Sequence, residues 1–162
     1  MNENMSIEDL LARAQIEEVQ YNYARGIDRR DWARYRAVFA DAVEIDFSSW
    51  SGLTTRMRAD DWVERVRGNL SGFDATQHVM TNLQYERDAT GIVCSVQMMA
   101  IHALVEADVR HFQVIGGYYT NHYVATERGW KVDRCNLNVR WEQGDRVLFS
   151  RAKARWEQAQ SA

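Results

Sequence analysis

The sequence predicts an α+β fold in which helices gather on one side of a long, mostly antiparallel sheet. Apolar residues recur at helical spacing in residues 6–39 and 60–70, and four long strand-like segments follow one another from residue 79 to residue 142. Only short turn signals separate these four segments. Helices followed by a meander are typical of α+β domains. A curved sheet closed by such helices forms a cone around an apolar pocket, whose mouth is a natural ligand site.

The first predicted helix covers residues 6–25 and starts with a variant of the capping box, Ser6 and Asp9. Gly26 is expected to end or bend this helix, because glycine weakens a helix. Asp31 then caps a second short helix. The apolar face of that second helix is expected to contain Trp32, Tyr35, Val38 and Phe39.

Residues 43–58 predict a half-buried strand, a turn at Ser48–Gly52 and a second, paired strand at Leu53–Arg58. Asp60 or Asp61 is expected to open the next helix, and Gly68 with the following SGFD segment is expected to end it. The inward face of this helix is predicted to contain Trp62, Val63, Val66 and Leu70.

The second half of the chain predicts four strands and a final helix, at Val79–Arg87, Ile92–Glu106, Val109–Thr126, Trp130–Glu142 and Arg146–Gln158. Gly116 and Gly117 indicate a bend or a close contact in the third of these strands. The sequence contains neither a repeat nor a linker, so residues 1–162 are expected to form a single domain. Residues 1–5 and 159–162 are expected to be frayed ends.

Composition narrows the class of protein. A chain of 162 residues with 46% hydrophobic residues and a net charge of −3 is typical of one globular domain. The absence of a basic block argues against nucleic acid as a partner. The sequence has no apolar run long enough for a membrane span and no secretory signal, which predicts a cytoplasmic protein. Cys94 and Cys135 lie far apart and are expected to be buried thiols.

Known site motifs are also absent. No pair of histidines has the spacing of a metal site, so we expect no metal. The sequence contains no GxGxxG, P-loop or GxSxG pattern, which disfavours nucleotide and serine-nucleophile chemistry.

The stretch Tyr21–Phe39 contains an acidic residue, Asp28, among apolar neighbours, and His78 follows about fifty residues later. We hypothesise that Asp28 and His78 meet in one pocket as an acid/base pair, with Tyr23 beside them. Histidine titrates near pH ~6.5, and a carboxylate on one ring nitrogen fixes its tautomer. On a straight helix Tyr23 and Asp28 would lie ~140° apart, so a break at Gly26 is expected. The alternative is structural: Asp28 as a cap, His78 as a half-buried histidine and Tyr23 as a core residue.

Several segments together resemble a known family: YARGID, DWARYRAVFADAVEID, QHVMTN, VIGGYYTNHYVATERGWKV and NVRWEQ. In this order and spacing the chain resembles the SnoaL-like branch of the nuclear transport factor 2-like superfamily, which has α+β cone folds. Within that branch it is most similar to the cofactor-free lyases, namely bile acid 7α-dehydratase, hexachlorocyclohexane dehydrochlorinase and scytalone dehydratase. The resemblance extends from about Ile7 to about Gln143.

The resemblance implies a reaction and roles for particular residues. His78 would be the general base, Asp28 would orient it, and Tyr23 would donate to the leaving group or bind a substrate carbonyl. Arg140 would bind a substrate oxygen or form a structural salt bridge. His102 lies near the position of a second histidine in scytalone dehydratase, although a structural role is the alternative.

The resemblance further implies a cofactor-free carbon–oxygen or carbon–halide lyase, in the first place a dehydratase, acting on an apolar, ring-containing small molecule. Alternatives are an isomerase or cyclase using the same proton abstraction, and a non-catalytic ligand-binding protein or dioxygenase β-subunit-like protein. Family members are commonly homotrimers or homodimers, so the open sheet face is expected to be buried between subunits. Strand alternation places His102 opposite Met99 and Ile101. The other expected substrate contacts are Trp50, Met99, Ile101, Tyr119 and Asn121.

Overall fold

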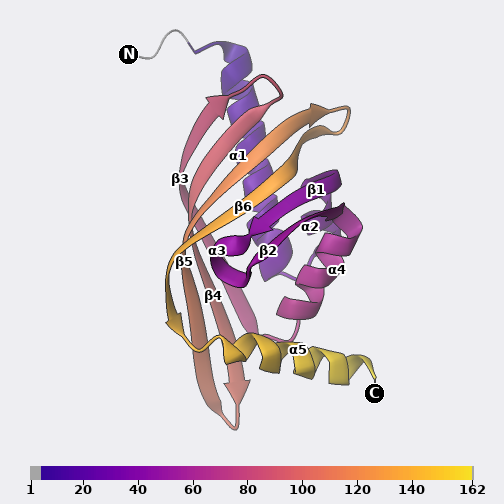
Figure 1. Cartoon of the computed structure of the whole chain (residues 1–162), viewed down its shortest axis with the longest axis vertical. Coiled ribbons are helices and arrows are strands. Elements are labelled where there is room, and N and C mark those ends of the chain that lie inside the picture. Colours follow the sequence, from indigo (N-terminus) through magenta and orange to yellow (C-terminus); the bar gives the residue numbers. More distant parts are fainter. Residues whose placement is uncertain (1–4, 162) are drawn as a thin grey trace.

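The computed structural model describes residues 5–161 and contains one curved sheet with helices on its concave side (Figure 1). The order of the strands is β2-β1-β6-β5-β4-β3. β1 and β6 run parallel, and the other neighbouring strands are antiparallel. The predicted α+β cone with a mixed sheet is therefore confirmed. The strands are β1 (Phe39–Phe47), β2 (Leu53–Arg58), β3 (Ala75–Arg87), β4 (Ile92–Glu106), β5 (Val109–Thr126) and β6 (Gly129–Gly144).

Helix α1 (Ile7–Asp28) begins with the predicted capping box, in which the Ser6 side chain accepts from the Asp9 backbone. It does not end at Gly26, so that prediction is wrong. A Cβ at Gly26 would lie 2.8 Å from the Cβ of Tyr35, on helix α2 (Trp32–Ala37). Glycine serves here to let two helices approach closely, and α1 continues to Asp28.

The middle of the chain follows the predicted order with shifted boundaries. Asp31 caps α2 as predicted, but Phe39 begins β1 instead of ending the helix. The expected turn before β2 is a short helix, α3 (Ser48–Ser51). Helix α4 (Ala59–Leu70) continues through Gly68, where a Cβ would meet nothing within 4 Å. The predicted inward residues of α4 are buried: Trp62, Val63, Val66 and Leu70.

The long strands match the sequence pattern well. β4 and β5 have the predicted limits, whereas β3 begins at Ala75 and therefore includes His78. The register between β5 and β6 shifts at Gly116 and Gly117, as expected for a bulge. Helix α5 (Val147–Gln160) includes residues 159 and 160, which were expected to be frayed. The predictions for residues 1–4 and 162 lie outside the described residues.

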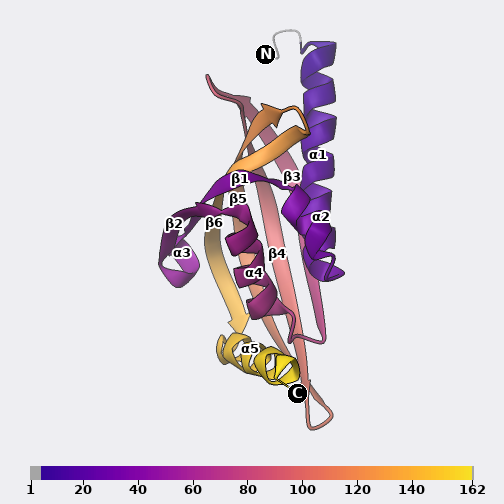
Figure 2. The same ribbon diagram turned by 90° about the vertical axis from the view of Figure 1, so that its right-hand side faces the viewer.

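Helices α1, α2 and α4 cover the concave side of the sheet, and α5 crosses its lower end (Figures 1 and 2). The core between these layers is rich in aromatic side chains, and the rings of Tyr35 and Phe39 pack edge to face with centroids 5.1 Å apart. Burial of one such side chain contributes about 1.5–3 kcal/mol. Among residues 5–161, no helix combines the length and apolar character needed to cross a membrane.

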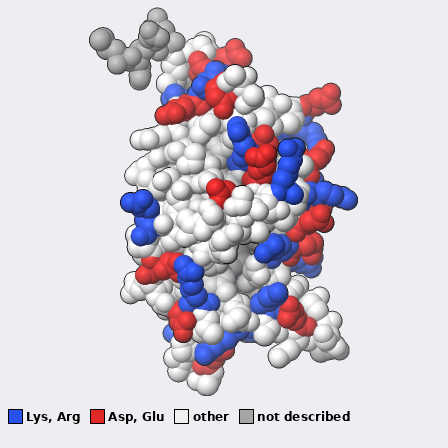
Figure 3. Space-filling model, viewed as in Figure 1, with Lys and Arg blue, Asp and Glu red and all other residues white. Residues whose placement is uncertain are grey.

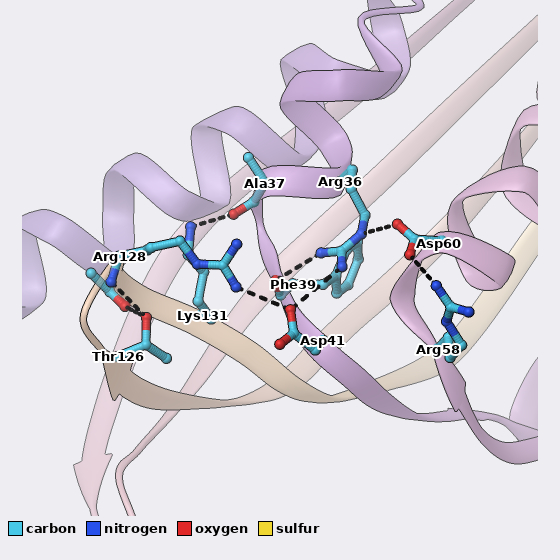
Figure 4. Close-up of polar contacts among 10 residues, drawn as sticks. Arg36, Ala37, Phe39, Asp41, Arg58, Asp60, Thr126, Arg128 and Lys131 are labelled. Atoms are coloured by element: carbon cyan, nitrogen blue, oxygen red, sulfur yellow. Dashed lines mark hydrogen bonds and ion pairs between the residues drawn. The ribbon is translucent and has the colours of Figure 1, made fainter.

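Charged side chains gather at both ends of the molecule and along the side formed by β1, α2 and α4 (Figure 3). On that side Arg36 contacts Asp60 and Asp41, and Arg128 contacts Asp41 from the β5–β6 turn (Figure 4). Arg58 also pairs with Asp60. Exposed pairs contribute only about 0–1 kcal/mol each, so this network joins α2, α4 and the strands without dominating stability.

Candidate active site

A pocket lies between the concave face of the sheet and the helices, with a volume of about 150 Å³. An apolar cavity of about this size takes up a benzene-sized molecule. The hydrogen-bonding groups in its wall include the hydroxyls of Tyr23 and Tyr119 and the rings of His78 and His102. Most of the remaining wall is aromatic or aliphatic: Ile27, Tyr35, Phe47, Trp50, Leu53, Trp62, Val66, Leu70, Met98, Ala100, Ile115, Leu137 and Phe149.

The structure brings His78 and Asp28 together. Asp28 is the last residue of α1, and His78 lies on β3. The Nδ1 atom of His78 is 2.7 Å from Oδ1 of Asp28, and the backbone N–H of His78 donates to Oδ2 at 2.8 Å. The side chains are 5% and 20% exposed, so this contact is largely shielded from water. His78 therefore contacts both carboxylate oxygens of Asp28.

Electrostatics determine the protonation state of this pair. Burial alone would raise the pKa of Asp28, but the hydrogen bonds and charge of His78, together with the Thr76 hydroxyl, outweigh it and lower the pKa. An ionised Asp28 can only accept, so Nδ1 of His78 is the donor. The second ring nitrogen, Nε2, is left for a ligand in the pocket, which His78 lines.

Thr76 also holds Asp28, and Arg30 holds Thr76; the sequence analysis did not single out either residue as a site residue. The hydroxyl of Thr76 donates to Oδ1 of Asp28 at 3.0 Å. Arg30 donates to the Thr76 hydroxyl at 2.8 Å and to the carbonyl of Ile27 at 2.7 Å. Strand alternation offered a signal for Thr76, because it lies two residues before His78 and so on the same face.

His102 faces the pocket from β4. It is 3% exposed, and its ring centroid lies 5.9 Å from that of His78. Burial, reinforced by the charge of His78, lowers the pKa of His102 to about 3, and a contact with the Gln113 carbonyl only partly opposes this. His102 is therefore neutral near pH 7. Its Nδ1 donates to that carbonyl at 3.3 Å, which leaves Nε2 as an acceptor.

Three phenols form part of the pocket wall, namely Tyr23, Tyr35 and Tyr119. The hydroxyl of Tyr23 donates to that of Tyr119 at 3.2 Å, and Tyr35 accepts from the indole N–H of Trp62 at 3.1 Å. Burial raises the pKa of Tyr23 well above its ordinary value, so it remains a neutral donor. Tyr23 reaches the pocket directly, whereas Asp28 reaches it through His78. The two residues therefore serve one site without the helix break expected at Gly26.

Four of the expected substrate contacts lie outside the pocket. β4 turns Met98 and Ala100 inward, so Met99 and Ile101 lie on the opposite face, and Met99 is 37% exposed. Asn121 is buried beside Gln20, 3.5 Å away, and does not line the pocket. Arg140 is exposed, because it is the extra residue of β6 at the bulge between the pairs Gly116↔Trp141 and Gly117↔Val139. Trp50, Tyr119 and His102 do line it.

The sequence analysis also missed pocket residues. Phe149 comes from α5, and Arg65 and Asn69 come from one face of α4. The sequence pattern did not indicate that these three side chains would face the pocket. Within the described part of the chain, no three side chains of the His, Cys, Asp or Glu type are grouped as in a metal site.

Known proteins share this architecture. The SnoaL-like domain family matches residues 8–136. The dehydratase cfoI of Aspergillus candidus is 29% identical over 166 residues, covering 93% of this chain and 94% of that protein. The Kfla4162 protein of Kribbella flavida superposes with a TM-score of 0.78 at 25% identity, covering 87% of this chain and 97% of that one.

A protein of Novosphingobium aromaticivorans assigned as a scytalone dehydratase gives a TM-score of 0.75 at 19% identity. That comparison covers 88% of this chain and 93% of the other, and at this identity it demonstrates the fold alone. The family match extends over most of the sequence, and the cone fold agrees with it. The chain belongs to the SnoaL-like family of the nuclear transport factor 2-like superfamily.

Proposed function

We propose that this protein is a cofactor-independent lyase that removes water from an apolar, ring-containing small molecule. The observation that carries the proposal is the 2.7 Å contact between Nδ1 of His78 and Asp28 at the wall of an apolar pocket. His78 acts as the general base through Nε2. Asp28 fixes the tautomer and stabilises the imidazolium that forms.

The proposed reaction starts on a carbon next to a carbonyl group. His78 takes the proton of that carbon, the electron pair of the C–H bond forms a C=C bond, and the neighbouring C–O bond breaks. The departing hydroxide takes that proton back from the His78 imidazolium and leaves as water, which restores the neutral base. Tyr23 and Tyr119 are neutral phenols in the pocket wall, so they can hydrogen-bond to the carbonyl oxygen as charge develops on it.

One comparison supports a lyase over other activities of this fold. The dehydratase cfoI is 29% identical to this chain over most of both proteins. The pocket supports the substrate class, because its aromatic wall and volume of about 150 Å³ suit a compact ring. The neutral His102 adds an acceptor for a hydroxyl group of the substrate.

The test is turnover of a panel of β-hydroxy ketones fused or joined to an aromatic ring. Loss of water gives a conjugated product that is followed by ultraviolet absorbance. We expect His78→Ala and Asp28→Asn to lower kcat/KM by ~10²–10⁴-fold, as for loss of a positioned general base. The matched control is His111→Ala, which removes a histidine outside the pocket lining.

Three results would contradict parts of this proposal. Near-wild-type kcat/KM in His78→Ala or Asp28→Asn would contradict the roles proposed for His78 and Asp28. A product that keeps its oxygen would indicate an isomerase or cyclase instead. Tight binding of panel compounds without any conversion would indicate a ligand-binding protein.

We also propose that the protein assembles into a homodimer or homotrimer through the outer face of the sheet. On this face Val79, Met99, Gly116 and Trp141 are neighbours in register across β3, β4, β5 and β6. Trp141 is 49% exposed and lies over Gly116, where a Cβ would meet the indole ring at 2.0 Å. Such an uncovered apolar row is typical of an interface.

Light scattering coupled to size exclusion tests the assembly. We expect the wild-type protein to elute as a dimer or trimer and Trp141→Lys to elute as a monomer. Val109→Lys is the control, because Val109 is also exposed but lies at the β4–β5 turn. A monomeric wild-type protein, or an unchanged mass in Trp141→Lys, would contradict this interface.

A further inference from the structure

Arg30 has an unusual setting for an arginine. Its guanidinium is half-buried and donates to the carbonyls of Ile27 and Phe73 and to the hydroxyl of Thr76, at 2.7, 3.2 and 2.8 Å. No carboxylate receives a direct hydrogen bond from it among the described residues. Its backbone adopts a φ of 57°, which a residue with a side chain rarely does. Strain of this kind persists where the surrounding structure requires it, often at a functional site.

The Thr76 hydroxyl has only one possible orientation between its two partners. A guanidinium carries donors alone, so the hydroxyl oxygen must accept from Arg30. The hydroxyl hydrogen is then free for Oδ1 of Asp28, 3.0 Å away. The Thr76 side chain is buried, at 8% exposure, so water does not compete for these contacts. A directed chain therefore runs from Arg30 through Thr76 and Asp28 to Nδ1 of His78.

We propose that Arg30 and Thr76 are positioning residues that hold the Asp28 carboxylate in the orientation that presents His78 to the pocket. This inference rests on the proposed function of the same site. Thr76 fixes the rotation of the carboxylate, because Oδ1 then faces both Thr76 and the His78 ring while Oδ2 receives the His78 backbone N–H. Arg30 fixes Thr76 and adds a positive charge behind the carboxylate.

The positive charge has a consequence for Asp28. A nearby guanidinium stabilises the ionised form of Asp28, which is the form that accepts a hydrogen bond from Nδ1 of His78. Other titratable or charged groups also line this pocket. His102 on β4 is neutral, the phenols of Tyr23, Tyr35 and Tyr119 are protonated, and Arg65 on α4 is a cation.

The first test uses the free, full-length protein and needs no substrate. Imidazole ¹⁵N NMR shifts, assigned with His78→Ala, report the tautomer of His78. We expect Arg30→Met to give a mixture of His78 tautomers where the wild type has the Nδ1–H form, because the Thr76 hydroxyl loses the donor that orients it toward Asp28. The matched control is Arg29→Met, which removes the adjacent, exposed arginine and should leave the wild-type tautomer of His78 unchanged.

A second pair of variants tests the role of the Thr76 hydroxyl. Thr76→Val keeps the shape of the side chain but removes the donor, so we expect a mixture of His78 tautomers where the wild type has the Nδ1–H form. Thr76→Ser restores the donor and should restore that form. This pair tests the proposal even if Arg30→Met does not fold, which thermal unfolding would reveal.

Activity gives a further readout once a substrate is known. Thr76→Val and Arg30→Met should each lower kcat by at least about tenfold with little change in KM, and Thr76→Ser should restore kcat. Equal NMR shifts in Arg30→Met and Arg29→Met, or a wild-type tautomer in Thr76→Val, would overturn the proposal. Failure of the lyase assay alone would leave the NMR result standing and would instead contradict the proposed reaction.

Discussion

Gly26 gives a sharp test of how α1 and α2 fit together. Replacing it with alanine in a helix interior normally stabilises a protein by about 1 kcal/mol, because glycine loses more backbone entropy on folding. Here the added Cβ would lie 2.8 Å from both Cβ and N of Tyr35 and 2.9 Å from its Cα. These atoms belong to the start of a side chain and its backbone, so no rotamer change relieves the overlap.

The overlap outweighs the gain. Overpacking in a closed site costs typically 1–3 kcal/mol, and here α2 as a whole would have to shift. We expect Gly26→Ala to lower the free energy of unfolding by about 1–2 kcal/mol, which lowers Tm by about 2–8 °C in a chain of this size. Asp28 lies two residues further along α1, so the same shift would disturb its contact with His78.

Gly68→Ala is the matched control, because Gly68 lies inside α4 and a Cβ there would meet nothing within 4 Å. We expect it to raise Tm by about 2–4 °C. Urea and thermal unfolding of the two variants, measured side by side by circular dichroism, give the comparison. If Gly26→Ala were as stabilising as Gly68→Ala, the close approach of α1 and α2 would be wrong.

Three other predictions follow from buried and ionised groups. His102 should stay neutral in ¹⁵N NMR down to about pH 4, since its pKa is lowered to about 3; titration near pH 6 would contradict its burial. Because the pKa of Asp28 is lowered on folding, its carboxylate stabilises the protein above its unfolded pKa of about 3.9, and this contribution is lost as pH falls through the folded pKa. The difference in urea midpoint between wild type and Asp28→Asn should thus be larger at pH 7 than at pH 3. An equal difference at both pH values would show that ionised Asp28 does not stabilise the fold. Burial raises the pKa of Cys94 and Cys135 to about 12, so Ellman's reagent should modify neither thiol until the protein unfolds, and rapid labelling of the native protein would refute this.

The sequence predicted the limits of β4 and β5, because turn residues separate these long runs of strand character. β4 and β5 have the predicted ends, and Asp31 caps α2 as expected. The contact between Asp28 and His78 followed from residue type and from the resemblance to a family, not from periodicity. Chain order alone could not show that the last residue of α1 would lie beside β3.

The face of β4 and the position of Arg140 could not be predicted from alternation. Both faces of β4 carry apolar residues, so the pattern does not reveal which of Met98 and Met99 points inward. Arg140 is the extra residue of a bulge in β6, and alternation along the sequence does not reveal where such a residue is inserted. Local propensity predicted that Gly26 would end or bend α1. Instead α1 continues to Asp28, and Gly26 allows α1 to pack closely against Tyr35.

Solvent deuterium exchange tests the role of His78 most directly. An aromatic ketone that lacks the leaving hydroxyl can bind and lose its α-proton but cannot eliminate water. In D₂O we expect the wild-type protein to exchange that proton, as followed by ¹H NMR, and His78→Ala to exchange it at least ~10²-fold more slowly. Equal exchange in the two proteins, or no exchange by wild type with a ketone that demonstrably binds, would contradict a proton-abstracting His78.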